Sequence, residues 1–367
     1  MTMAGYTNFH ADKISSFIEQ LFLKIGCNPI DAANIAKVLV TAELRGIPSH
    51  GLMRVTDYIA LWKAGRLNSK PDVRIIHETP STAVIDGNQC AGMIAGLKAM
   101  GTAMQKAKAV GTGWVSVQNS NHFGIAGYYA MMALKEDMIG ICMTNANPLV
   151  APTFSVDRLL GTNPIAVAVP AGTEPPFVAD FATTPIARGK LDLMHKKGLK
   201  APFGFVQDKT GKPSDNPNIL TDGGAILPLG GDREHGSHKG YCLGAIVDIF
   251  SAALSGAGFG PFVPPSVAYL PLIKDAPGLG TGHFFGAMRI DAFRPAIEFK
   301  ATMDQWIQTF RKAKPAEGYE KVLIPGDIER ELEEKYAVEG IPVLNSIWEK
   351  VNECGKEFDI ILEVEKV

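Results

Sequence analysis

One ten-residue segment constrains the fold more than any other, because it carries the chain from a short apolar strand into a helix. The segment is Asn119-Ser-Asn-His-Phe-Gly-Ile-Ala-Gly-Tyr128, between an expected strand at Trp114–Val117 and an expected helix at Tyr128–Lys135. Such a junction lies at the carboxyl end of a sheet, where α/β proteins usually bind ligands. It holds His122, whose imidazole could move a proton near neutral pH. The alternative is a loop histidine that only makes local hydrogen bonds.

A second histidine lies in the segment Ser49-His-Gly-Leu-Met-Arg54. We expect Ser49 to be the N-cap of a helix that runs to Ala64, with His50 in its first turn. Arg54 follows His50 by four residues, so the two side chains should share one helical face. A base beside a guanidinium suits a substrate that has both a hydroxyl and a carboxylate. The alternative is a capped helix with a surface arginine.

The bulk composition is that of an ordinary globular protein. The chain has 367 residues, of which 46% are hydrophobic and 20% charged, so it can bury a large core in two or three domains. Its net charge of −2 gives no reason to expect nucleic acid or a membrane as partner. The five cysteines are scattered without a CxxC pair, and no long apolar run or signal-peptide pattern is present. We therefore expect a soluble cytoplasmic protein with reduced thiols.

Hydrophobic periodicity predicts alternating helices and short strands. The expected helices are Phe9–Ile25, Pro29–Leu44, Ser49–Ala64, Met93–Ala109, Tyr128–Lys135, Pro185–Lys197, Gly240–Leu254, Pro295–Lys312, Ile328–Val338 and Val343–Phe358. The expected strands are Val73–His77, Thr82–Asp86, Trp114–Val117, Ile139–Thr144, Ile165–Val169, Phe177–Phe181 and His283–Ile290. The first two strands should pair as a hairpin. The apolar run Gly240–Leu254 should be a helix buried in the core, and Lys200–Asn218 a polar loop.

Several common motifs are absent from the sequence. It has no GxGxxG turn after a strand, no GxxxxGK[ST] phosphate loop, no HExxH and no GxSxG. His235 and His238 stand three residues apart in a glycine-rich loop, which is weak evidence for a metal, and we expect no metal site. The patterns alone favour an α/β enzyme in which histidine, arginine and lysine converge on an anionic substrate.

Seven short segments follow one another in a characteristic order along the chain. They are Ser49–Arg54, Asn119–Gly124, Gly161–Pro164, Asp180–Thr184, Ala187–Lys190, His238–Tyr241 and Pro325–Asp327. With these segments the sequence resembles, over nearly its whole length, the second type of malate/L-lactate dehydrogenase family. That family also includes sulfolactate and ureidoglycolate dehydrogenases, diketogulonate reductase and cyclic-imine reductases.

The resemblance implies an α/β fold whose NAD(P)-binding domain, at residues 119–289, is not of the Rossmann type. Residues 1–118 and 290–367 would then form a helical N-terminal region and a mixed α/β substrate and dimerisation domain. The missing glycine fingerprint agrees with this expectation. The resemblance also implies a homodimer with its active site near the subunit boundary.

The resemblance further implies a cofactor, NAD or NADP, and a set of residues along it. Those residues are His122, Gly124, Gly161, Asn163, Asp180, Phe181, Ala182, Lys239, Pro325, Gly326 and Asp327. Lys239 precedes an apolar helix and could pair with pyrophosphate or ribose oxygens, whereas the alternative is a solvent-facing lysine. Gly161 and Asn163 would form a turn near the nicotinamide.

The implied reaction interconverts a small 2-hydroxy acid, such as malate or lactate, and its 2-oxo acid. We favour His50 as the acid/base, assisted by Ser49, with His122 beside the substrate and Arg54 on its carboxylate, although family members differ in which histidine transfers the proton. The alternative activity is reduction of a diketo-sugar acid or a cyclic imine. Lys190 stands where cyclic-imine reductases carry aspartate, which disfavours that activity. Ala146 stands where ureidoglycolate dehydrogenases carry serine, a second departure that limits the substrate assignment.

Overall fold

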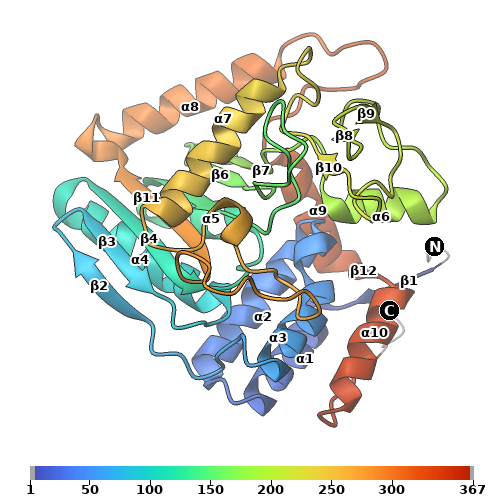
Figure 1. The fold of residues 1–367 in the computed structure, drawn as a ribbon. Coiled ribbons are helices and arrows are strands. Elements are labelled where there is room, and N and C mark those ends of the chain that lie inside the picture. Colours follow the sequence, from blue (N-terminus) through green and yellow to red (C-terminus); the bar gives the residue numbers. More distant parts are fainter. Residues whose placement is uncertain (1–4, 364–367) are drawn as a thin grey trace.

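A seven-stranded mixed sheet organises the computed structural model, which describes residues 5–363 (Figure 1). Its strand order is β2-β3-β4-β11-β5-β6-β7, in which β3 and β4 are parallel and the other neighbouring pairs antiparallel. The strands are β2 (Arg74–Glu78), β3 (Thr82–Asp86), β4 (Thr112–Ser120), β5 (Met138–Thr144), β6 (Ile165–Val169), β7 (Phe177–Phe181) and β11 (Thr281–Arg289). The late strand β11 therefore lies in the middle of the sheet, and the seven predicted strands are confirmed.

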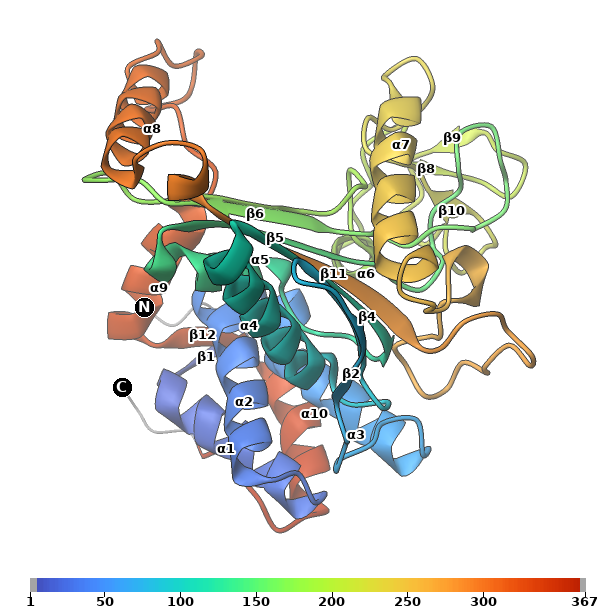
Figure 2. The ribbon, with the colours of Figure 1, turned by 90° about the vertical axis from the view of Figure 1, so that its left-hand side faces the viewer.

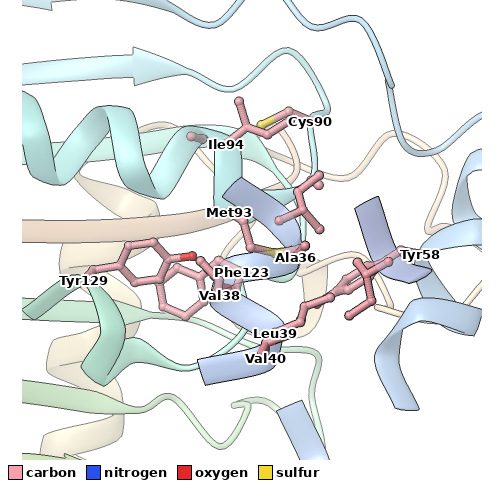
Figure 3. Packing of buried hydrophobic residues seen from close by; sticks show 14 of the residues in the cluster. Ala36, Val38, Leu39, Val40, Tyr58, Cys90, Met93, Ile94, Phe123 and Tyr129 are labelled. Atoms are coloured by element: carbon pink, nitrogen blue, oxygen red, sulfur yellow. The ribbon is translucent and has the colours of Figure 1, made fainter. Parts of the chain in front are cut away.

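Helices cover one face of the sheet more completely than the other. The helices α4 (Gly92–Val110) and α5 (Ala126–Met132) pack on one face, with α1 (Ala11–Lys24) and α2 (Pro29–Leu44) on the same side (Figure 2). The helices α7 (Ser237–Asp248) and α8 (Ala296–Arg311) rise from the opposite face (Figure 2). The main hydrophobic core lies on the first side, and Figure 3 shows Tyr58, Phe123 and Tyr129 packed within it.

Local signals explain why these elements begin and end where they do. The side chain of Asn28 accepts a hydrogen bond from Asp31 N–H at 2.9 Å, so Asn28 is the N-cap of α2. At the end of α4, Gly111 adopts φ +92°, the left-handed conformation that commonly stops a helix.

The remaining elements form smaller units around the sheet. Residues expected as a polar loop contain the short strands β8 (Val206–Gln207) and β9 (Pro213–Ser214), which pair with each other. On its other side β8 pairs with β10 (Ala225–Ile226), and this small sheet lies beside α6 (Arg188–Lys196). Near the termini β1 (Tyr6–Phe9) pairs with β12 (Ile341–Leu344). The last helices are α9 (Asp327–Glu339) and α10 (Asn345–Lys356), so the start of the helix predicted at 343–358 is a strand.

The helix predicted from Ser49 to Ala64 is wrong in its first half. Two 3₁₀ turns, η1 (Pro48–His50) and η2 (Leu52–Arg54), precede α3 (Val55–Lys63), and Ser49 makes no helix cap. Between the turns Gly51 adopts φ −106° and ψ −133°, which interrupts the helical path. His50 and Arg54 therefore do not share a helical face.

The apolar segment Gly240–Leu254 is helical, but the prediction that it is buried in the core is wrong. It continues from α7 into a π-helical turn, η4 (Ile249–Ala253). Ile249 is 54% exposed and Leu254 59% exposed, because the segment lies on the face of the sheet with fewer helices.

The sheet is continuous across the domain boundaries expected from the sequence. The boundary at 118/119 falls inside β4, and β11 pairs with both β4 and β5. The division into domains of 1–118 plus 290–367 and 119–289 stays a prediction, and its residues 1–4 and 364–367 lie outside the described part of the chain. Between residues 5 and 363 no helix is long and apolar enough to cross a bilayer.

Candidate active site

Two histidines from distant parts of the sequence meet beside the end of β4. His50, in η1, and His122, in the loop after β4, stack with ring centroids 5.4 Å apart and an interplanar angle of 28°. Neither Nε2 atom has a hydrogen-bond partner within residues 5–363, and neither is among the buried unpartnered polar atoms of that range. Both rings therefore present one free nitrogen to a ligand.

The other nitrogen of each ring is held by the protein. His50 Nδ1 lies 2.8 Å from the Ser49 hydroxyl oxygen. His122 Nδ1 lies 2.7 Å from the Tyr58 hydroxyl oxygen and accepts a hydrogen bond from Gly124 N–H at 3.3 Å. These contacts fix the orientation of both rings.

The electrostatic surroundings keep both imidazoles neutral. Burial, with a smaller contribution from the Arg54 guanidinium, lowers the pKa of His50 to about 4. Burial first, and then the neighbouring His50, Arg54 and His283, hold the pKa of His122 well below its ordinary value. At neutral pH both rings are therefore uncharged, and each has one nitrogen with a hydrogen and one without.

Arg54 is anchored on one edge and open on the other. Its Nε donates to the Ser49 carbonyl at 2.7 Å and Nη1 donates to Asp57 at 3.1 Å. Nη2 has no partner within the described part of the chain. The end of the guanidinium is thus available for a carboxylate.

The β7 edge of the sheet carries a cavity that contains several of the predicted cofactor residues. It has a volume of about 490 Å³, and its lining includes Asp180 and Phe181 at the end of β7 with Pro325 and Gly326 before α9. Asp180 also accepts a hydrogen bond from Gly127 N–H, at the start of α5, at 2.7 Å. The structure therefore brings 180–181 and 325–326 together, although they lie far apart in sequence.

Backbone geometry explains why residue 326, which lines this cavity, is a glycine. It adopts φ +98°, and a Cβ atom there would lie 3.0 Å from Val178 Cβ. The Pro325 carbonyl accepts from Val178 N–H at 3.0 Å, which joins the segment to β7.

Asp327 has its carboxylate engaged by the protein itself. It is buried, accepts from Ile324 N–H at 2.9 Å, and pairs with Arg311 at 2.8 Å and Arg330 at 2.6 Å. These contacts hold the 324–327 turn in shape.

Asn163 and Gly161 are buried where the chain after β5 contacts α7. Asn163 is fully buried; its side chain accepts from Ala146 N–H at 3.1 Å and donates to the Gly244 carbonyl at 2.9 Å. A Cβ on Gly161 would lie 2.2 Å from the Ala146 carbonyl oxygen, so only glycine fits there. The two Asn163 hydrogen bonds thus link the chain after β5 to α7.

Lys239 lies in the first turn of α7 and is exposed. Its ammonium makes no ion pair or side-chain hydrogen bond with any other described residue. The neighbouring His235 and His238 contact Asp232 at 2.5 Å and Arg233 at 3.1 Å respectively. From residue 5 to residue 363 no three histidine, cysteine or acidic side chains are grouped as a metal site.

Comparisons with known proteins give one consistent result. Residues 9–352 match the family model described as malate/L-lactate dehydrogenase. The chain belongs to this family. Over 97% of both chains it is 39% identical to the malate dehydrogenase of Pyrococcus horikoshii. It is also 39% identical to the L-sulfolactate dehydrogenase of Methanocaldococcus jannaschii, over 93% of this chain and 94% of that one.

Solved structures of malate/L-lactate dehydrogenase relatives have the same fold. The Pyrococcus horikoshii malate dehydrogenase superposes with a TM-score of 0.88 at 37% identity, over 100% of this chain and 99% of that chain. The malate dehydrogenase of Entamoeba histolytica gives a TM-score of 0.90 at 34% identity, over 97% and 99% of the two chains. The non-Rossmann α/β fold expected from the resemblance is confirmed. The chain is an oxidoreductase that uses a nicotinamide cofactor, NAD(P), to interconvert hydroxy and oxo acids.

The residues present fit such a cofactor. The cavity lined by Asp180 and Gly326 has a volume of about 490 Å³, which is enough for part of a nucleotide. The unpaired ammonium of Lys239 suits phosphate oxygens.

Three further residues at the dehydrogenase site were missed by the sequence analysis. Tyr58 contacts His122, and Glu43 accepts from Leu52 N–H at 2.6 Å behind the His50 turn. His283 is fully buried, with Nδ1 2.7 Å from Thr144 Oγ1 and Nε2 2.9 Å from Ser120 Oγ. Two of these residues could have been noticed in the sequence as polar residues within apolar segments. Glu43 lies in an apolar helix, and His283 begins an apolar strand.

Proposed function

We propose that this malate/L-lactate dehydrogenase family member oxidises a small 2-hydroxy acid, such as malate, lactate or sulfolactate, to the 2-oxo acid and catalyses the reverse reduction. The observation that carries the proposal is the stacked pair His50 and His122, each with Nε2 free, beside the open end of Arg54. An acid/base group, a second imidazole and a carboxylate anchor are what a 2-hydroxy acid needs.

Each side chain has a separate task in this proposal. Arg54 binds the substrate carboxylate with two parallel hydrogen bonds, which fixes how C2 faces the cofactor. His50 takes the proton of the 2-hydroxyl at Nε2, and Ser49 holds the opposite nitrogen. The bound nicotinamide supplies the acceptor for hydride. His122 contacts the reacting oxygen and the nicotinamide side of the substrate.

The cofactor residues are proposed from the cavity and the resemblance together. Asp180, Phe181 and Ala182 would lie along NAD or NADP with Pro325 and Gly326, and Lys239 would pair with its phosphates. Asp327 would support the 325–326 turn through Arg311 and Arg330. Gly124, Gly161 and Asn163 would shape the nicotinamide end. We also propose that the protein is a cytoplasmic homodimer.

The acid/base assignment is tested by His50→Gln. The glutamine keeps a polar side chain but cannot exchange a proton, so kcat should fall about 10²- to 10⁴-fold. Cofactor affinity, measured by fluorescence titration, should stay within about twofold because the cavity at Asp180 is untouched. The matched control is His77→Gln on exposed β2, which should behave as wild type. Turnover of His50→Gln within about tenfold of wild type would refute the assignment.

A further inference from the structure

The contacts of His122 carry information about where its proton resides. Gly124 N–H points at Nδ1 from 3.3 Å, and a backbone amide can only donate. Nδ1 must therefore hold a lone pair. A neutral imidazole carries one proton, so that proton is on Nε2, the nitrogen without a protein partner.

Tyr58 strengthens the same arrangement from the core side. Its hydroxyl oxygen is 2.7 Å from Nδ1, and because Nδ1 carries no hydrogen, the hydroxyl must be the donor. Tyr58 is 1% exposed and packs against Phe22 at a ring-centroid distance of 6.3 Å. The phenol is thus a fixed donor.

Tyr58 is not placed to relay a proton onward. Within residues 5–363 its hydroxyl has no hydrogen-bond partner besides His122. Burial also raises the pKa of the Tyr58 phenol above its ordinary value, so a tyrosinate there is strongly disfavoured.

His50 differs in a way that matters for the reaction. Its Nδ1 faces a hydroxyl, Ser49 Oγ, at 2.8 Å, and a hydroxyl can accept as well as donate. His50 can therefore place a proton on Nδ1 and leave Nε2 as a free base. His122 cannot do so without turning two donors away from Nδ1.

We infer that Tyr58, together with Gly124 N–H, is a positioning residue that keeps neutral His122 in its Nε2–H form. In this form His122 donates a hydrogen bond to the C2 oxygen of the substrate and keeps its proton, while His50 exchanges the proton. This inference deepens the proposed function and rests on it.

The proton and electron balance of the step is complete with these two roles. In oxidation the substrate O–H bond breaks and its proton binds His50 Nε2, giving an imidazolium whose Nδ1–H donates to Ser49. The C2–H bond breaks and the hydrogen leaves with both bonding electrons as hydride, for which a bound nicotinamide would be the acceptor. The C2–O bond becomes a carbonyl that accepts from His122 Nε2–H, and the reduction reverses each change.

The tautomer can be measured without turnover by ¹⁵N NMR of protein labelled at histidine. Imidazole nitrogens with and without hydrogen have clearly separate ¹⁵N shifts. We expect the His122 resonances to report Nε2–H and bare Nδ1 between about pH 6 and pH 9. A proton on Nδ1 in the wild-type protein would overturn the inference, whatever happens in the variants.

Tyr58→Phe removes one donor and keeps the ring that fills the core. We expect an Nδ1–H population of His122 to appear, and kcat to fall roughly three- to tenfold, as for loss of one buried hydrogen bond. KM for the cofactor should not change. Tyr58→Phe with wild-type tautomer and wild-type kcat would also overturn the inference.

Tyr128→Phe is the control, since it deletes the hydroxyl of a half-buried tyrosine on α5 without touching the peptide that carries Gly124 N–H. Within residues 5–363 the Tyr128 hydroxyl makes no hydrogen bond, and its ring packs edge to face on Tyr129 at a centroid distance of 5.6 Å. The variant should therefore leave the His122 tautomer as in wild type. The result is distinguishable from failure of the proposed function, because full activity of His50→Gln would remove His50 as the base while the Nε2–H assignment of His122 remained measurable.

Discussion

Arg54 shows how one side chain can be both anchored and available. Its Nε and Nη1 are held by the Ser49 carbonyl and by Asp57 at 2.7 and 3.1 Å. Those bonds pre-orient the guanidinium, so less rotamer entropy is lost when a carboxylate binds. The same anchor ties the arginine to the turn that carries His50.

Arg54→Lys keeps the charge but loses the planar fork. We expect kcat/KM for the 2-hydroxy acid to fall roughly ten- to hundredfold, because a charge-assisted hydrogen bond is lost. Steady-state kinetics at saturating cofactor measure this change, and cofactor Kd should be unaltered. Arg294→Lys, which alters an exposed ion pair with Glu298 on α8, is the control. An unchanged kcat/KM would contradict the carboxylate role.

At the scale of elements, the turn between α2 and α3 replaces the expected helix start. Glu43, near the end of α2, is 4% exposed and accepts from Leu52 N–H at 2.6 Å. A Cβ on Gly51 would lie 2.3 Å from Glu43 Oε1, so the glycine lets the turn pack on the carboxyl group. The turn is therefore shaped by a residue seven positions before His50.

Burial raises the pKa of Glu43 to about 7, against a smaller opposing effect of the Leu52 N–H bond. The folded protein thus holds this proton more tightly than the unfolded chain does. The resulting stabilisation is complete below the unfolded pKa near 4.5 and is lost as pH rises to about 7, by roughly 3 kcal/mol.

Glu43→Gln removes this titration and keeps an oxygen for Leu52 N–H. We expect the melting temperature of the variant, relative to wild type, to increase as pH rises from 5 to 8. Calorimetry at four pH values measures the difference, in which titrations common to both proteins, including that of His50, cancel. A difference that is independent of pH would show that Glu43 ionises normally.

At the scale of the whole molecule, apolar side chains are exposed on α8 and along the segment formed by α7 and η4. Ile249 and Leu254 are 54% and 59% exposed, and on α8 Ile297 is 77% exposed. Both helices stand on the same face of the sheet (Figure 2). Apolar area of this kind on one face is typical of a subunit interface, and the homodimer proposed above would bury it against a second copy of the chain.

Ile249→Glu combined with Leu254→Glu places two charges on that face. We expect the purified protein to elute as a monomer, since burying unpaired carboxylates is costly. Size-exclusion chromatography with light scattering measures the mass, and circular dichroism checks the fold. Ile30→Glu, at a 74% exposed position on α2, should leave the assembly unchanged. A double variant with wild-type mass would place the interface elsewhere.

Local patterns in the sequence were enough to predict most elements. The helix Pro29–Leu44 and the strands Ile165–Val169 and Phe177–Phe181 have the predicted bounds, because caps and hydrophobic alternation act over a few residues. The sequence also identified the family through short segments in order. It could not predict that Gly240–Leu254 would lie on the surface, because apolar residues look alike in a core and at an interface.

Tertiary structure alone decided how the site is supported. Tyr58 and His122 are 64 residues apart, yet a 2.7 Å contact between them holds one nitrogen of the ring. Glu43 and His283 likewise act through neighbours that no local pattern relates to them. The sequence determined which groups are present and which elements carry them. Only the packing of those elements decided which hydrogen-bond donors face which nitrogen, because such contacts depend on positions in space rather than on spacing along the chain.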